Sequence, residues 1–152
     1  MQRIRLKTLI DASTEICFDL SRNIDLHVKS MIDSNEKAVT GKITGLINLG
    51  ESVTWEARHF GIKFKLTSRI TDMEAPCRFT DEMSKGPFKY MKHQHFFKKV
   101  GDLTEMTDIF EFEAPFGLVG SIVEKLILKT YLTNLLAKRN LTIKQAAETK
   151  KS

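Results

Sequence analysis

Hydrophobic and polar residues alternate along most of this chain, a pattern typical of β-strands that bury one face. The first such segment covers residues 2–10, where Ile4 and Leu6 alternate with basic residues. Six more lie between Gly41 and Glu113, separated by short turns rich in glycine, proline or asparagine. They cover residues 42–48, 52–59, 63–73, 78–83, 88–100 and 103–113. Because such short connections cannot cross a sheet, the pattern predicts a seven-stranded antiparallel meander.

The hydrophobic spacing changes to the helical period in two regions. After Ser13, a good helix starter, apolar residues recur every four positions from Ile16 to Ile24, and a second short helix is expected through residues 26–31. A long helix is expected from about residue 117 to Ala147, opened by a capping-box pattern formed by Ser121 and Glu124, with a wide apolar face through at least Ala137. A helix of that length spans on the order of 30 Å and can cross a whole sheet. The predicted class is therefore α+β.

Length and composition favour one domain with an ordinary core. The chain has 152 residues, of which 41% are hydrophobic, and no apolar run is long enough for a membrane span. The N terminus has no signal-peptide core, and Cys17 and Cys77 lie far apart, so we expect both to be reduced and half-buried. These features predict a cytoplasmic monomer or homodimer, with one domain over residues 1–147 and a basic disordered tail at 148–152.

The positive charge is concentrated near the C terminus. The net charge is +5, and the charged residues from Lys138 onward sum to +4: Lys138, Arg139, Lys144, Glu148, Lys150 and Lys151. The remaining body carries only +1, which does not indicate a nucleic-acid surface. We interpret the basic end as a solvated, frayed helix terminus and expect no nucleic-acid partner.

Strand parity places several polar residues on the same face as apolar ones. The expected inward sets are Val53, Trp55, Ala57 and His59; Phe64, Leu66, Ser68 and Ile70; Phe79, Asp81 and Met83; Met91, His93, His95 and Phe97; and Met106, Asp108, Phe110 and Phe112. The contrast between faces is least in residues 78–83. An unpaired buried polar group costs about 1–3 kcal/mol, so the polar members require mutual hydrogen bonds or a wet cavity. Trp55 is either a core aromatic or a wall on which a ligand stacks.

Two histidines form the most specific local pattern. His93 and His95 are two residues apart on one strand, so their rings share a face with about 6.5–7 Å between Cα atoms. Zinc can use this spacing, but only His59 and Asp108 are inward candidates for further ligands, so we predict no metal and no cofactor. A satisfied polar network and a pocket wall that orients a ligand's oxygen are both left open. Acid–base catalysis beside Asp108 is a special case of the second.

The order of predicted elements resembles the helix-grip fold of the SRPBCC superfamily, which includes START proteins, polyketide cyclases and birch-allergen-like proteins. The matching stretches are residues 55–61, 66–70, 78–82, 86–88, 93–97 and 106–108. They look like the bacterial cyclase or cell-division-inhibitor-like branch, and the resemblance covers essentially the whole chain. It implies a seven-stranded antiparallel sheet curved around a long C-terminal helix, with two short helices between strands 1 and 2. Met91 departs from the aromatic residues common in that branch, which widens or softens a pocket.

The resemblance implies a ligand-binding cavity but no particular reaction, since only some members are enzymes. The first hypothesis is binding of a small hydrophobic or aromatic molecule between the sheet and the C-terminal helix. The second is a polyketide cyclase or dehydratase whose acid–base groups are His93, His95 and Asp108. A third, an interaction protein with a filled core, predicts no cavity. The expected ligand contacts are Trp55, His59, Phe64, Leu66, Ser68, Asp81, Met91, His93, His95, Phe97, Asp108, Phe110, Ile122 and Leu126.

Overall fold

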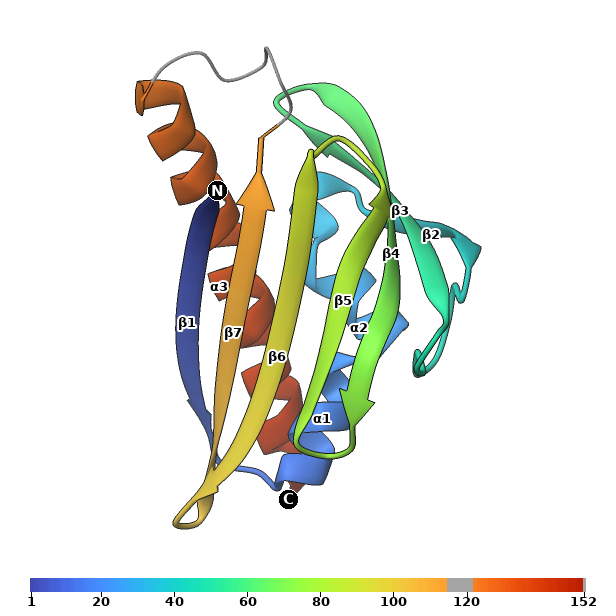
Figure 1. Ribbon diagram of the computed structural model, residues 1–152. Helices are drawn as coiled ribbons and strands as arrows, with labels where there is room; N and C mark the ends of the chain where they lie inside the picture. The colour runs from blue at the N-terminus through green and yellow to red at the C-terminus, as the bar shows by residue number, and fades with distance from the viewer. Residues whose placement is uncertain (115–121, 152) are drawn as a thin grey trace.

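The computed structural model describes residues 1–114 and 122–151, without the side chains of residues 122–124 (Figure 1). The strands are β1 (Gln2–Ile10), β2 (Lys37–Gly41), β3 (Ser52–His59), β4 (Ile62–Glu74), β5 (Arg78–Lys85), β6 (Tyr90–Val100) and β7 (Leu103–Glu113). The helices are α1 (Thr14–Ser21), α2 (Ile24–Ser30), the short 3₁₀ helix η1 (Ile32–Ser34) and α3 (Ile122–Lys151). The predicted Ser121–Glu124 capping box lies outside the described residues.

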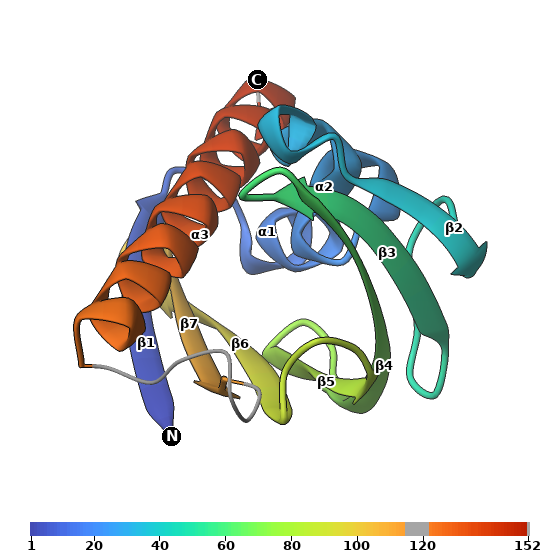
Figure 2. The same ribbon diagram turned by 90° about the horizontal axis from the view of Figure 1, so that it is seen from above.

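The described strands form one antiparallel sheet in the order β1-β7-β6-β5-β4-β3-β2. The sheet curves, and α3 runs along its concave side with α1 and α2 beside it (Figures 1 and 2). Every strand from β2 to β7 pairs with its neighbour in sequence, while β1 closes the other edge against β7. This arrangement confirms the predicted helix-grip architecture.

Side-chain caps explain where the two short helices begin. Ser13 accepts a hydrogen bond from the backbone N–H of Ile16 at 3.2 Å, and Asn23 accepts one from the backbone N–H of Leu26 at 3.0 Å. Each bond satisfies a backbone donor that the first helical turn leaves without a partner. The two predicted short helices are confirmed, but the second begins at Ile24, within the segment assigned to the first, because the chain is capped again at Asn23.

Strand β2 differs from the prediction, which placed a strand at residues 42–48. That segment is instead a loop, in which Gly45 adopts a φ of +78° and accepts a hydrogen bond from Ile24 N–H. The alternation of apolar and polar residues in this segment does not come from a strand with one buried face, since Ile47 is buried while Ile43 is exposed. The actual strand, Lys37–Gly41, is mostly exposed on both faces and therefore shows no alternation to detect.

Inward parity holds for the main strands. Phe18 of α1 contacts the rings of Phe79 and Phe97 edge-on, with centroid distances of 5.5 Å to each. Val53 and Ile70 are buried in the same hydrophobic cluster as these three phenylalanines. The Phe79 face of β5 therefore points into the molecule, and one edge-to-face aromatic pair adds about 0.5–1.5 kcal/mol beyond area burial.

The C-terminal helix extends farther than predicted. It continues to Lys151, whose ammonium lies 2.7 Å from a carboxylate oxygen of Asp11, so residues 148–151, which were expected to be disordered, are helical. Arg139 is also not part of a solvated end, because it is only 3% exposed. The prediction that Arg139 is solvated, which rested on the charge pattern alone, is wrong. Cys17 is buried, whereas Cys77, which was expected to be half-buried, is exposed.

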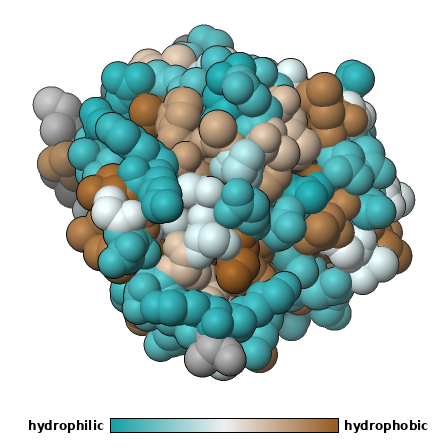
Figure 3. Space-filling model, turned by 90° about the horizontal axis from the view of Figure 1, so that it is seen from below, coloured by the Kyte–Doolittle hydropathy of each residue, from teal (hydrophilic) through white to brown (hydrophobic). Residues whose placement is uncertain are grey.

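The surface near the C terminus mixes hydrophobic and hydrophilic areas (Figure 3). None of the helices in the described part of the chain is long and apolar enough to cross a membrane. Several exposed apolar residues lie at the β3–β4 turn and at the start of α3, namely Phe60, Ile62, Leu126 and Ile127. Three of them, Phe60, Ile62 and Ile127, border the cavity described next.

Candidate functional site

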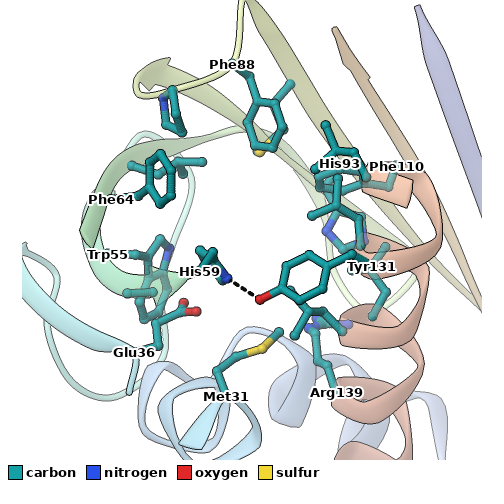
Figure 4. A pocket seen from close by; sticks show the side chains of 18 of the residues that line it. Met31, Glu36, Trp55, His59, Phe64, Phe88, His93, Phe110, Tyr131 and Arg139 are labelled. Carbon is teal, nitrogen blue, oxygen red and sulfur yellow. Dashed lines mark hydrogen bonds between the residues drawn. The ribbon is translucent and has the colours of Figure 1, made fainter. Parts of the chain in front are cut away.

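A cavity of about 490 Å³ lies between the concave sheet face and the helices (Figure 4). Trp55, Phe64 and Phe110 from the sheet and Tyr131 from α3 contribute aromatic walls, and Phe88 adds another from the β5–β6 connection. The volume falls within the roughly 300–1,000 Å³ typical of small-molecule sites. A filled core, the third sequence hypothesis, is therefore incompatible with this structure.

The cavity collects most of the expected ligand contacts. Nine of the fourteen line it: Trp55, His59, Phe64, Leu66, Ser68, Asp81, Met91, His93 and Phe110. His95 lines only a smaller adjoining space of about 70 Å³, while Phe97 and Asp108 are buried behind the walls of both. Leu126 was expected to point inward but is 59% exposed. Leu128 and Leu132 line the cavity from this part of α3 instead. The side chain of Ile122 lies outside the described residues.

The lining residues that escaped the sequence reasoning include Met31, Glu36, Phe88, Tyr131 and Arg139. The first three lie at helix ends or in connections, where no periodicity assigns a face. Arg139 could have been found from its spacing, because it continues a stripe that includes Leu136 and Ile143 on the buried face of α3. A polar residue inside an apolar stripe indicates a buried polar contact.

One end of the cavity is bounded by a network of charged and polar side chains. His93 Nε2 lies 2.8 Å from Asp108 Oδ1, and His95 Nε2 lies 2.7 Å from Asp81 Oδ1. Both contacts run diagonally across neighbouring strands, since His93 is directly opposite Asp81 and His95 is directly opposite Asp108. We call Asp81, His93, His95, Asp108, Arg139 and Asn140 the polar cluster.

Helix α3 completes the polar cluster from the other side. Asn140 Nδ2 donates to Asp108 Oδ2 at 2.7 Å, and Arg139 Nη1 donates to Asp108 Oδ1 at 3.5 Å and to Asn140 Oδ1 at 2.9 Å. Arg139 Nη2 also donates to the backbone oxygen of Ser21 at 3.2 Å. Asp108 is 1% exposed, so these bonds compensate the cost of burying its charge. They also fix α3 to the sheet.

The network determines the charge of its members. Burial lowers the pKa of His93 to about 4, aided by the nearby His95 and only partly opposed by Asp108. Burial by itself would raise the pKa of Asp108, but hydrogen bonds from His93 and His95 hold that pKa well below its ordinary value. The pKa of Asp81 is lowered in the same way, against the effect of burial, by His95. At neutral pH, His93 is therefore a neutral ring between two carboxylates.

The neutral state fixes the tautomer of His93. An ionised carboxylate can only accept hydrogen bonds, so Nε2 of His93 must carry the proton that it donates to Asp108. Nδ1 is then an acceptor with a free lone pair, and it has no partner among the described residues. No fully buried side-chain nitrogen or oxygen lacks a partner in that part of the chain, so Nδ1 retains accessible surface. His93 lines both the cavity and the smaller space beside it, so this acceptor is accessible at that end of the cavity.

A second polar pair lies across the cavity, between β3 and α3. His59 Nδ1 is 2.6 Å from the hydroxyl oxygen of Tyr131, as the dashed line in Figure 4 shows. Burial lowers the pKa of His59, with Glu36 acting in the opposite direction. Phe60 stacks obliquely on Tyr131, with 4.6 Å between ring centroids. These contacts join the β3–β4 hairpin to α3 beside the exposed apolar residues. His59 was expected to join the other histidines but lies apart from them.

Asp81, His93 and His95 resemble a metal site in composition. One potential ligand atom from each lies within 4.8 Å of the others, and these side chains are common zinc ligands. However, each histidine already directs Nε2 to a carboxylate, and Arg139 Nη2 lies 3.5 Å from His95 Nδ1. A second cation there would be repelled by the guanidinium. The donor set therefore fits a hydrogen-bonded network better than a metal centre.

Three solved structures match this one over nearly their whole length. TTHA0849 from Thermus thermophilus is 17% identical, with a TM-score of 0.73 and coverage of 96% of this chain and 99% of that one. A START superfamily protein from Mycobacterium smegmatis is 12% identical, with a TM-score of 0.70 and 97% coverage of both chains. Major latex-like protein 151 from Panax ginseng is 15% identical, with a TM-score of 0.66 and coverage of 96% and 97%.

This chain has the helix-grip fold that its resemblance to the SRPBCC superfamily predicts. The predicted resemblance is thereby confirmed at the level of structure. Neither a family model nor a curated protein matches the sequence. Identities of 12–17% indicate a shared fold without a shared ligand or reaction, so function has to be argued from the helix-grip cavity itself.

Proposed function

We propose that this helix-grip protein binds a small hydrophobic or aromatic molecule in its cavity. The observation that carries the proposal is an interior space of about 490 Å³ with mainly aromatic and aliphatic walls and the polar cluster at one end. Apolar walls supply affinity by removing ligand surface from water, while a few fixed polar groups orient the ligand. The START and major latex-like neighbours support only the shared fold.

A cavity-filling variant tests the proposal. Leu132 lines the cavity from α3, so Leu132→Trp places a large ring inside it, whereas Thr130→Trp adds the same ring on the exposed face of the helix. Nile red, a neutral apolar dye, should bind saturably to wild-type protein and to Thr130→Trp but at least tenfold more weakly to Leu132→Trp. Equal binding by all three folded proteins, checked by their thermal melts, would show that the dye binds elsewhere.

Trp55 offers a second, independent readout. It lines the cavity and stacks against His27, with 4.2 Å between ring centroids, so a bound aromatic molecule should quench or shift its emission. Because Trp55 is the only tryptophan, the signal needs no correction for others. Saturable dye binding without any change in Trp55 emission would place the ligand away from this wall. Native mass spectrometry of protein from its own cell extract would then identify the class of any retained ligand.

A cyclase or dehydratase is the second candidate, and the orientation of His93 favours it. Asp108 holds the ring while Nδ1 faces the cavity, which is the geometry of an oriented general base. His95 and Asp108 do not line the main cavity, so only His93 could touch a substrate there. If a poly-β-keto thioester is converted, His93→Gln should lower the rate about a hundredfold to ten-thousandfold while binding survives. An unchanged rate would exclude this role.

A further inference from the structure

The polar end of the cavity presents hydrogen-bond acceptors together with negative charge. Nδ1 of His93 is one acceptor, as its tautomer requires. Asp81 supplies another, because its Oδ1 is bonded to His95 while its Oδ2 has no partner among the described residues. Asp81 lines the cavity, so that free oxygen also retains surface there. A ligand group that fits this end must donate a hydrogen bond.

The carboxylate of Asp81 argues against an anionic ligand beside it. Asp81 lines the cavity with an unpartnered oxygen, whereas both terminal nitrogens of Arg139 already donate to Asp108, Asn140 and Ser21. A carboxylate entering beside Asp81 would therefore meet like charge in a region of low dielectric. The fatty-acid type of ligand is therefore disfavoured at this end.

A hydroxyl group satisfies both conditions. It is neutral, it donates one hydrogen bond, and its oxygen can accept another. Ser68 lines the same end of the cavity, and its hydroxyl has no partner among the described residues, so it can donate to the incoming oxygen. A ligand hydroxyl that donates to His93 and accepts from Ser68 leaves its apolar body among the aromatic walls.

We propose that the cavity selects neutral hydroxylated hydrophobic molecules, such as phenols or apolar alcohols, and seats the hydroxyl against Nδ1 of His93. This inference rests on the proposed function and names its ligand class. The selection comes from three features of the chain: Asp108 fixes the proton on Nε2 of His93, Asp81 rejects anions beside it, and most of the remaining wall is aromatic or aliphatic.

Three fluorescent probes that share one ring system test the selection: 1-hydroxypyrene, 1-methoxypyrene and pyrene-1-carboxylate. Wild-type protein at pH 7 should bind the hydroxyl compound about tenfold more tightly than the methyl ether, the value of one buried hydrogen bond. The carboxylate should bind most weakly. In His93→Phe, the hydroxyl and methoxy compounds should bind with equal affinity. Phe64→Leu, on another part of the wall, should weaken both of them by the same factor and preserve their ratio.

The outcomes separate this proposal from the broader one. If wild-type protein binds the methyl ether as tightly as the hydroxyl compound, or binds the carboxylate most tightly, selection for a hydroxyl is wrong while ligand binding in the cavity stands. If no probe binds, including unsubstituted pyrene, both proposals fail. The wild-type comparison needs no variant, so a His93→Phe protein that does not fold leaves the test decisive.

Discussion

Acidification should destabilise this protein at a pH where its carboxylates are still ionised. His93 has an ordinary pKa of about 6.5, and burial lowers that pKa to about 4 in the folded state. The unfolded chain therefore binds more protons than the folded chain between these two values, and the free energy of unfolding falls as the pH falls through that window. Below about pH 4, both states bind the proton and the loss is complete.

The magnitude follows from the two pKa values. Integrating the proton linkage from pH 7 to pH 5 gives a loss of about 2 kcal/mol for His93 alone. For a chain of this size, that corresponds to a fall in melting temperature of roughly 4–8 °C. The carboxyl groups of Asp81 and Asp108 add nothing in this window, because their pKa values are lowered from ordinary values that already lie below it.

The assay is urea unfolding at half-unit pH steps from 7 to 4.5, for wild type and two variants. His93→Gln cannot titrate, while its amide can still donate to Asp108, so its stability curve should lack the slope that His93 contributes. His59→Gln is the matched control, since the pKa of His59 is also lowered by burial and its removal should leave the His93 slope in place. Parallel wild-type and His93→Gln curves throughout the window would refute the assigned neutral state.

Three further changes follow from the same structure. Asp108→Ala should cost about 3–5 kcal/mol, because it leaves a buried guanidinium without its carboxylate; a loss below about 1 kcal/mol in urea unfolding would contradict this. Gly41→Ala should cost more than Gly45→Ala, since both glycines have positive φ but only at Gly41 would Cβ strike the Ser52 carbonyl oxygen; equal losses would remove the steric argument. Deleting residues 126–152 should abolish folding, and a cooperative melt of the truncated chain would contradict the role given to α3.

The fold was predictable because its strands alternate cleanly and its connections are short. Six of the seven described strands, the antiparallel pairing and the long terminal helix follow from periodicity. Strand β2 could not be placed, since Lys37–Gly41 is exposed on both faces and leaves no pattern, while Ile47 creates an alternation that belongs to a loop. Alternation reports burial of single residues, and it indicates a strand only where the backbone is also extended.

The cavity was only partly predictable. Strand parity found the sheet side, from Trp55 to Phe110, because a two-residue period allows only two faces. The helix side was less certain: the described part of the first turns of α3 carries apolar residues at both half-buried and exposed positions, so Leu126 was assigned inward although it is exposed. Arg139 was taken for part of a basic tail, since charge was counted along the sequence without reference to the helical stripe that continues through it.

The polar cluster links stability to ligand choice. Its members come from β5, β6, β7 and α3, and the contacts through Asp108 are also those that hold α3 across the sheet. Any substitution that changes the acceptor facing the cavity therefore also perturbs the attachment of the helix. Affinity alone cannot separate these effects, but the ratio between a hydroxyl ligand and its methyl ether can. Loosening of α3 weakens both ligands together, whereas loss of the His93 acceptor weakens only the one that donates a hydrogen bond.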